Sequence, residues 1–187
     1  VLISGGDGTV DLIVNAMKEL NVNMSIGILP SGTANDFAKA VNLPFNPVEC
    51  IERIVKSKPK KVDIGKINHK YFINVASAGM FTDVSQKINP EFKNSMGKVS
   101  YYLKGIEEAL YMRKFSIEVN SSEINYNGDM YLMLIFNGKT AGNINLAYKA
   151  EIDDGLLDVI IVKKILLPNM LPLLINILKG EHLEGYN

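Results

Sequence analysis

Two glycine-bearing turns contain the residues of this chain whose types and spacing could do chemistry. The first, Gly5-Gly6-Asp7-Gly8-Thr9, lies between a short apolar run and a helical pattern. Glycines let a backbone approach a ligand closely, and free N–H groups at a helix start favour a phosphate. The carboxylate of Asp7 beside a phosphate would require a cation or a ribose hydroxyl between them. Taken alone, the segment is equally consistent with a plain turn.

The second turn is Pro30-Ser31-Gly32-Thr33-Ala34-Asn35-Asp36-Phe37. It also follows an apolar run and precedes a helical pattern. If the two runs are parallel strands, both turns leave the same carboxyl edge of the sheet, where open α/β sheets bind ligands. A simple helix cap is the alternative, because Thr, Asn and Asp are preferred before helices. Two such turns at one edge favour a ligand site.

The elements that must position these turns alternate over the first 57 residues. Short apolar runs at Val1–Ile3 and Ile26–Leu29 predict buried parallel strands. Helical spacing predicts three helices: one with Val10, Ile13, Met17 and Leu20 on one face, a short one over Asn35–Val41, and one from Asn46-Pro47 with Val48, Ile51 and Val55 on one face. Strand and helix in alternation imply right-handed crossovers.

After Pro59 the pattern changes to mainly antiparallel strands. Val62–Ile67 and Tyr71–Ser77 flank Asn68-His69 as a hairpin, and Lys98–Met112 is an amphipathic helix. Further strands are predicted, with turns at Asn120–Ser122 and Asn127-Gly128: Phe115–Val119, Glu123–Tyr126, Met130–Phe136 and Leu157–Val162. The predicted fold class is α/β, a parallel α/β part over 1–59 followed by a β-rich second domain over 60–187.

Composition excludes several classes of protein. With 187 residues and 47% hydrophobic content, the chain can bury a real core. Twenty basic and twenty acidic residues cancel, which argues against a dedicated nucleic-acid binder. The single cysteine, Cys50, is expected to be a small core residue in a reducing compartment. The apolar stretch Ile165–Leu178 is too short to span a bilayer.

The motifs GGDGT and PSGTANDFA resemble the catalytic domain shared by diacylglycerol kinases, sphingosine kinases and bacterial soluble lipid kinases. GGDGT alone would also fit NAD kinases, and the second motif, with Asn35-Asp36-Phe37, discriminates between them. The resemblance continues in the family's order through the segments 62–65, 71–75, 137–138 and 153–158. It implies an NAD kinase/diacylglycerol kinase-like fold whose second domain is β-sandwich-like.

The resemblance also implies roles for residues of the site. The ATP-binding residues would be Gly5, Gly6, Asp7, Gly8, Thr9, Val10, Asp11, Leu12 and Thr33, although the family usually has Asn-Glu where Asp11-Leu12 stand here. The catalytic carboxylates would be Asp7 and Asp36, held near magnesium and phosphates, and Asp154. A metal would be held by Glu151, Asp154 and the carbonyl of Leu156; a solvated acidic turn is the alternative.

The implied function is ATP- and Mg²⁺-dependent phosphorylation of a lipid hydroxyl, with diacylglycerol as acceptor and phosphatidic acid as product. The alternatives are an NAD kinase-like or other small-molecule kinase, and a non-catalytic binding fragment. We expect a cytoplasmic, peripherally membrane-associated protein whose partner is a lipid at the membrane surface, without nucleic acid; a homodimer is left open. Lys56, Lys58, Lys60 and Lys61 could attract lipid headgroups, or form a solvated linker.

The resemblance further implies sequence outside the printed chain. The family has another β-α-β unit before GGDGT and an Asp-Gly-Glu motif whose Glu is the main catalytic base. We therefore expect that base beyond Asn187 and expect the 187-residue chain alone to be inactive.

Overall fold

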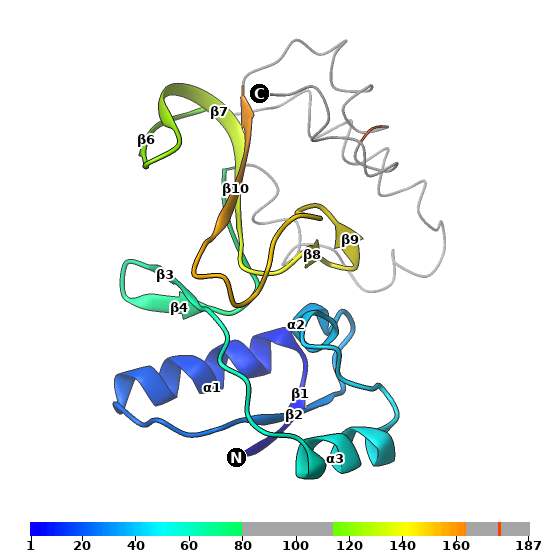
Figure 1. The fold of residues 1–187 in the computed structure, drawn as a ribbon. Coiled ribbons are helices and arrows are strands. Elements are labelled where there is room, and N and C mark those ends of the chain that lie inside the picture. The colour runs from blue at the N-terminus through cyan, green and yellow to red at the C-terminus, as the bar shows by residue number, and fades with distance from the viewer. Residues whose placement is uncertain (80–113, 164–175, 177–187) are drawn as a thin grey trace, which may run out of the picture. The chain divides into compact units, whose positions relative to one another are not determined.

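The computed structural model describes residues 1–79, 114–163 and 176 (Figure 1). The chain forms two compact units: Val1–Ala76 with Ile135–Val159, and Ser77–Leu134 with Ile160–Asn187. The chain thus leaves the first unit after Ala76 and returns to it at Ile135. The helix predicted over Lys98–Met112 and the stretch Ile165–Leu178, apart from Asn176, lie outside the described residues.

The first unit begins with a parallel strand pair joined by a helix. Strand β1 (Leu2–Gly5) is followed by α1 (Asp7–Glu19) and β2 (Gly27–Pro30). The register places Leu2 opposite Gly27 and Gly5 opposite Pro30. Both strands therefore end level with each other, and both glycine turns leave from the same edge. This confirms the predicted strands and their parallel pairing.

The core of the first unit collects residues that are distant in sequence. Its buried members are Val10, Ile28, Phe37, Ile73 and Ile152. Partly buried hydrophobic residues pack around them: Val14, Ile26, Ala40, Val41, Leu43, Val62 and Ile64. Because Ile73 and Ile152 complete this cluster, the unit that holds the glycine turns is built from more than the first 59 residues.

Two further helices follow β2. Helix α2 (Asp36–Ala40) is short, and α3 (Pro47–Lys56) begins with Pro at its first position. Asn46 caps α3, because its side-chain oxygen accepts the N–H groups of Val48 and Glu49. Cys50 on α3 is fully buried, and its thiol donates to the carbonyl of Ile28 at 3.2 Å. The predicted helix start and the core position of the cysteine are both confirmed.

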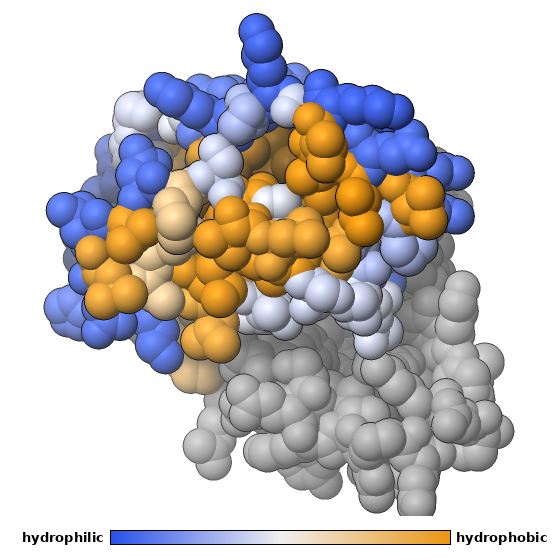
Figure 2. All heavy atoms as spheres, turned by 90° about the horizontal axis from the view of Figure 1, so that it is seen from below, coloured by the Kyte–Doolittle hydropathy of each residue, from blue (hydrophilic) through white to orange (hydrophobic). Residues whose placement is uncertain are grey.

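The apolar face predicted for α3 is not the face that packs. Val48, Ile51 and Val55 are 66%, 44% and 78% exposed. Viewed from below, Figure 2 shows apolar side chains gathered on the surface that carries the N-terminus, β1 and α3. Helical spacing correctly places the three residues together. It does not indicate whether another part of the protein covers them. The side of α3 that packs in the core carries Cys50 instead.

A tight hairpin follows, formed by β3 (Gly65–Ile67) and β4 (Lys70–Phe72). Asn68 takes the left-handed conformation at φ 52°, which confirms the predicted turn at Asn68-His69. The strand predicted over Tyr71–Ser77 is wrong in one respect: it breaks at Ile73-Asn74, and β5 (Val75–Gly79) is separate. The break arises because the backbone of these two residues bonds to Asp11 and to Asn137.

The remaining strands form a second sheet and a small hairpin. The sheet has the order β10-β7-β5, with β6 also paired to β7, where β6 is Phe115–Asn120, β7 is Asn125–Phe136 and β10 is Asp158–Lys163. The predicted turn at Asn127-Gly128 is wrong, because these residues pair with Glu118 and Ile117 inside β7. The turn after Asn120 is confirmed. Strands β8 (Thr140–Ala141) and β9 (Ile144–Asn145) form the small hairpin.

These elements confirm the predicted fold class, a parallel α/β part followed by a β-rich part. The domain boundary at 59/60 stays a prediction. No helix within the described ranges is both long and apolar enough to cross a bilayer.

Candidate functional site

The two glycine turns touch each other through their backbones. A Cβ atom placed on Gly32 would lie 2.4 Å from the Cα of Gly6, and one on Gly6 would lie 2.9 Å from the Cα of Gly32. No side chain fits at either position without moving the other loop. The turn after β2 is also tied to β1, because the N–H of Ser31 donates to the carbonyl of Gly5. The predicted convergence at one sheet edge is therefore a direct contact.

The first turn of α1 presents N–H groups without a side-chain cap. Gly6 is the N-cap residue and makes no side-chain hydrogen bond, and a Cβ on Gly8 would meet open space. Uncapped N–H groups at the start of a helix form a favourable site for a phosphate. The hydroxyl-bearing residues Thr9 and Thr33 are both exposed near these turns.

Three residues assigned to the ATP site differ in which of their groups are accessible to a ligand. The side chain of Val10 is buried in the core, so only its backbone remains for a ligand, and that N–H already bonds to Gly6. Leu12 is exposed to solvent. Asp11 points toward the β4–β5 connection, where its Oδ1 accepts the N–H of Ile73 at 2.9 Å.

Asp7 connects the first glycine turn to the second. Its Oδ1 accepts the N–H of Phe37 at 2.8 Å and its Oδ2 accepts the N–H of Asp36 at 3.1 Å. Helix α2 has no cap from its own N-cap residue, so a carboxylate from α1 supplies that role. Each oxygen retains further lone pairs. Asp7 thus fixes the geometry of the two turns whether or not it contacts a cation.

Asp36 is buried and connects α2 to the β8–β9 hairpin. Its side chain is 4% exposed. Oδ1 accepts the hydroxyl of Thr140 at 2.9 Å and the N–H of Asn143 at 3.1 Å, while Oδ2 accepts the N–H of Gly142 at 2.6 Å. Three donors from one short segment surround this carboxylate, which makes it a positioning residue for that segment.

Two site residues were not identified from the sequence. Asn35 is buried in the left-handed conformation, where Asn is among the better tolerated residues, and its amide bonds to both the N–H and the carbonyl of Gly32. Lys39 donates to the carbonyl of Ala34 and to the side chain of Asn143. The sequence did contain a signal for Asn35, because this residue is part of the PSGTANDFA motif. It contained none for Lys39, whose contact with Asn143 joins residues 104 apart along the chain.

Asp11 is the titratable group of this site with a perturbed pKa. Burial raises the pKa of its carboxyl above the usual value, the hydrogen bond from Ile73 lowers it, and the nearby Asp7 raises it further. The net direction is upward, so the charged form of Asp11 is disfavoured in the folded protein. The fold is consequently more stable when Asp11 is protonated, and that contribution is lost as pH rises through the folded pKa.

Asp11→Asn is therefore expected to stabilise the protein near neutral pH. The amide oxygen can still accept from Ile73, while the desolvated charge and its repulsion with Asp7 disappear. Because the group is only half-buried, solvent screening limits the rise in Tm to roughly 1–2 °C. Thermal unfolding against pH checks this: the difference from wild type should shrink as pH falls through the folded pKa. A variant less stable than wild type at neutral pH would contradict it.

The acidic segment 151–156 is anchored to Asp63. The N–H of Gly155 donates to Oδ2 of Asp63 at 2.7 Å, and the N–H of Asp63 donates to the carbonyl of Ile152. Asp153 forms an ion pair with Lys60 at 2.7 Å. Asp154 accepts the N–H of Leu156 through Oδ1. The hydrogen bonds and ion pairs of this segment thus go to residues 60–63 and to the segment itself.

The proposed metal ligands Glu151, Asp154 and Leu156 are all exposed on this segment. Among the residues that the structure describes, no group of three or more His, Cys, Asp or Glu side chains is arranged around a metal position. The predicted set has only two carboxylates and one carbonyl. Mg²⁺ often takes one or two carboxylates and keeps several waters, so this donor chemistry fits it.

Two family models match the chain in sequence order. Residues 1–67 match the diacylglycerol kinase catalytic domain, and residues 74–186 match the YegS C-terminal NAD kinase beta sandwich-like domain. The chain belongs to the diacylglycerol kinase catalytic-domain family. The first matched region contains both glycine turns, and with them Asp7 and Asp36. The recognition made from GGDGT and PSGTANDFA is confirmed.

Relatives and solved structures agree with this membership. A diacylglycerol kinase of Staphylococcus carnosus (strain TM300) is 34% identical over 98% of this chain and 60% of its own length. One from Bacillus subtilis (strain 168) is 30% identical over 98% and 61%. A crystal structure of a diacylglycerol kinase from Bacillus anthracis str. Sterne matches with a TM-score of 0.69 and 28% identity, covering 100% of this chain and 58% of that one. The chain spans about 60% of the curated relatives it matches.

Proposed function

We propose that this family member acts as an ATP-dependent lipid kinase that transfers the γ-phosphate to the hydroxyl of diacylglycerol, giving phosphatidic acid. The relatives that are 30% and 34% identical over nearly the whole chain are named diacylglycerol kinases, which supports this choice. In the reaction a bond forms between the acceptor oxygen and the γ-phosphorus. The bond from that phosphorus to the bridging oxygen breaks, ADP leaves, and the hydroxyl proton goes to a base.

The observation that carries the proposal is the uncapped start of α1 beside the Gly6–Gly32 contact. Phosphoryl transfer needs positioning and charge stabilisation more than covalent help from the protein. The N–H groups of the first turn of α1 would bind phosphate oxygens, and the hydroxyls of Thr9 and Thr33 are exposed to add hydrogen bonds. The open space at Gly8 leaves room for the nucleotide.

Asp7 and Asp36 would hold this surface in shape. Asp7 fixes α2 to the first turn of α1, and Asp36 fixes the β8–β9 hairpin to α2. Asp7 accepts two hydrogen bonds and Asp36 accepts three, which supports a positioning role for both carboxylates.

Magnesium would be held on the acidic segment by Glu151, Asp154 and the carbonyl of Leu156. When bound, the cation would supply positive charge and rigidity to a segment that is otherwise anchored through Asp63. We further propose that the protein works at the cytoplasmic surface of a membrane, where its lipid substrate lies, and leave a homodimer as an assembly to be tested.

An acceptor screen with the full-length protein tests the function. Labelled ATP and Mg²⁺ are supplied with diacylglycerol in mixed micelles, with sphingosine, or with NAD, and the products are separated. We expect label in phosphatidic acid. Transfer to NAD alone would replace the lipid assignment with an NAD kinase-like one, and transfer to none of the acceptors would support a binding module.

Asp154→Asn is expected to reduce the stabilisation that magnesium gives, whereas Asp153→Asn is expected to retain it. The amide removes charge from the proposed ligand at nearly constant shape, while Asp153 is already paired with Lys60. The measurement is the Tm of each variant with and without Mg²⁺, which does not depend on activity. Identical magnesium shifts for both variants and the wild type would restore the interpretation of the segment as a solvated acidic turn.

A further inference from the structure

One buried asparagine, Asn74, reaches the carboxylates of the site through a single residue. Its side-chain Nδ2 donates to the carbonyl of Thr140 at 2.8 Å. The hydroxyl of the same Thr140 donates to Asp36 at 2.9 Å, and the N–H of Asp36 donates to Asp7. Asn74 therefore holds the residue that supplies one of the three donors around the buried carboxylate of Asp36.

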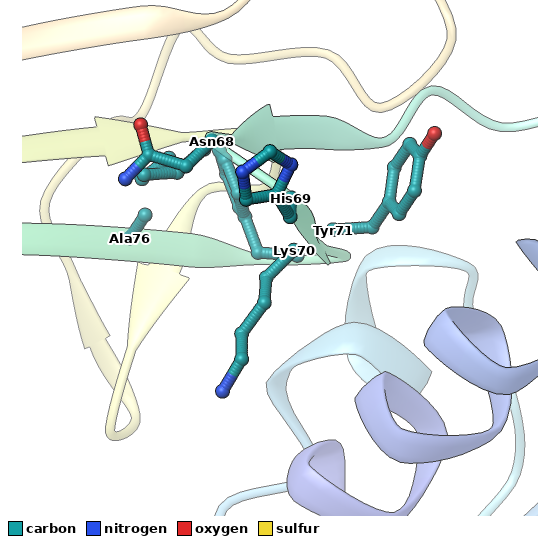
Figure 3. A pocket seen from close by; sticks show the side chains of 7 residues that line it. Asn68, His69, Lys70, Tyr71 and Ala76 are labelled. Atoms are coloured by element: carbon teal, nitrogen blue, oxygen red, sulfur yellow. The ribbon is translucent and has the colours of Figure 1, made fainter. Parts of the chain in front are cut away.

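Asn74 lies in the connection between β4 and β5, which is also bonded to α1. The N–H of the preceding residue, Ile73, donates to Oδ1 of Asp11 on α1. Figure 3 shows the two strands that this connection joins, with Tyr71 on β4 and Ala76 on β5. Together with the links through the carboxylates of the glycine turns, these bonds close a ring. It runs from α1 through the connection, the start of β8 and α2, and back to α1.

The other polar atom of the Asn74 side chain indicates that the amide is placed for its donor. Among the residues that the structure describes, Oδ1 of Asn74 is buried without a hydrogen-bond partner. Burial of an unpaired acceptor is unfavourable, and an apolar side chain would avoid that cost. An apolar side chain could not donate to the carbonyl of Thr140, however. Rotating the amide by half a turn would place its oxygen against that carbonyl, so the contact fixes the orientation of the amide.

The surroundings of Asn74 hold both its backbone and its side chain. A Cβ on Gly138 would lie 2.5 Å from Oδ1 of Asn74 and 3.7 Å from the Cβ of Ala40 in α2, so a glycine at this position leaves room for the amide. The N–H groups of Asn137 and Gly138 both donate to the carbonyl of Asn74. The side-chain amide of Asn137 also donates to the carbonyl of Ile73. Asn74 is thus fixed well enough to position another group.

We propose that Asn74 is a positioning residue of the phosphoryl-transfer site. It holds Thr140 where its hydroxyl meets Asp36, and it thereby fixes the β8–β9 hairpin beside the second glycine turn. The inference rests on the proposed kinase for the chemistry that this arrangement serves, since displacement of a group by about 1 Å can cost roughly a hundredfold in rate. The hold on the hairpin is measured without turnover, so the two proposals fail separately.

Amide hydrogen exchange of the full-length protein tests the hold on the hairpin. The N–H groups of Gly142 and Asn143 both donate to Asp36 and report on that contact. In Asn74→Ala we expect these two amides to exchange roughly tenfold faster, which corresponds to the loss of one hydrogen bond that keeps the hairpin in place. Unchanged exchange at both amides would overturn the proposal, whatever happens to turnover.

Gly138→Ala approaches the same contact from the other side. The added methyl group displaces the amide of Asn74 but leaves residue 74 itself intact, so Gly142 and Asn143 should again exchange faster. The matched control is Asn120→Ala, because the amide of Asn120 donates to a surface carboxylate, that of Glu118. We expect exchange in this control within about twofold of wild type. Equal acceleration in the control would contradict the assignment of the effect to Asn74.

Steady-state kinetics distinguishes positioning from a general loss of structure. The phosphates of ATP are proposed to bind at the start of α1, so Asn74→Ala should lower kcat by about tenfold while the KM for ATP stays within about twofold of wild type. Thr140→Val removes the hydroxyl that Asn74 positions and should show the same pattern. The double variant should then be no slower than the slower single variant, because both act through one contact. Losses that multiply in the double variant would show that Asn74 acts by another route and would overturn the proposal.

Discussion

Asp36→Ala is expected to lower the free energy of unfolding of the full-length protein by about 3–5 kcal/mol, the cost of breaking a buried charged interaction. The change leaves the hydroxyl of Thr140 and the N–H groups of Gly142 and Asn143 without their acceptor. Each buried donor left unsatisfied costs about 1–3 kcal/mol unless water reaches it. The β8–β9 hairpin should loosen from α2, and kinase turnover should fall with it.

Urea unfolding of wild type and variant measures this loss. Asp153→Ala is the matched control, because that carboxylate is exposed and forms a surface ion pair with Lys60. We expect the control to stay within about 1 kcal/mol of wild type. If Asp36→Ala were as stable as the control and lost only turnover, Asp36 would act directly on the substrate or cation, as the resemblance alone suggests.

Gly32→Ala is expected to damage nucleotide binding and stability together. The added methyl group would lie 2.4 Å from the Cα of Gly6 and 2.9 Å from Oδ1 of Asn35. One of these neighbours is backbone and cannot turn aside, so the two loops must separate. Overpacking of this kind costs about 1–3 kcal/mol. Separation would also move the start of α1 relative to Thr33, and we expect at least a tenfold rise in the KM for ATP.

Gly8→Ala is the control for this substitution. A Cβ on Gly8 meets nothing within 4 Å, and alanine favours a helix over glycine by about 1 kcal/mol. This variant should be as stable as wild type or slightly more so in thermal unfolding. If Gly32→Ala instead retained both the Tm and the KM for ATP of the wild type, the contact between the glycine loops would have no role in the site.

Local signals in the sequence were sufficient for the elements around the site. The short apolar runs predicted β1 and β2, Asn46-Pro47 predicted the start of α3, and Asn68-His69 predicted the hairpin turn. Each of these depends on residues that are neighbours along the chain. Capping, turn conformation and strand burial are decided at that range, so the fold of this region could be predicted well.

Contacts between distant residues could not be predicted in the same way. Asp36 was placed in the site through the motif, but its partners lie 104 to 107 residues further along the chain. No periodicity indicates that Thr140, Gly142 and Asn143 return to α2. Gly128 shows the converse error. Its residue type predicted a turn at Asn127-Gly128, but both residues lie inside β7 and pair continuously with β6. The site is thus recognisable from its motifs, while its supporting hydrogen bonds require the folded arrangement.

The contact between α1 and β4 also covers the outer edge of the β3–β4 hairpin. The Asn15 side chain accepts the N–H of Tyr71 and donates to its carbonyl, both at 2.8 Å, as the backbone of a neighbouring strand would. Asp11 adds the same kind of bond to the N–H of Ile73. Open strand edges recruit strands from other molecules. Here helix side chains satisfy that edge, so a foreign strand could pair with it only by first displacing α1.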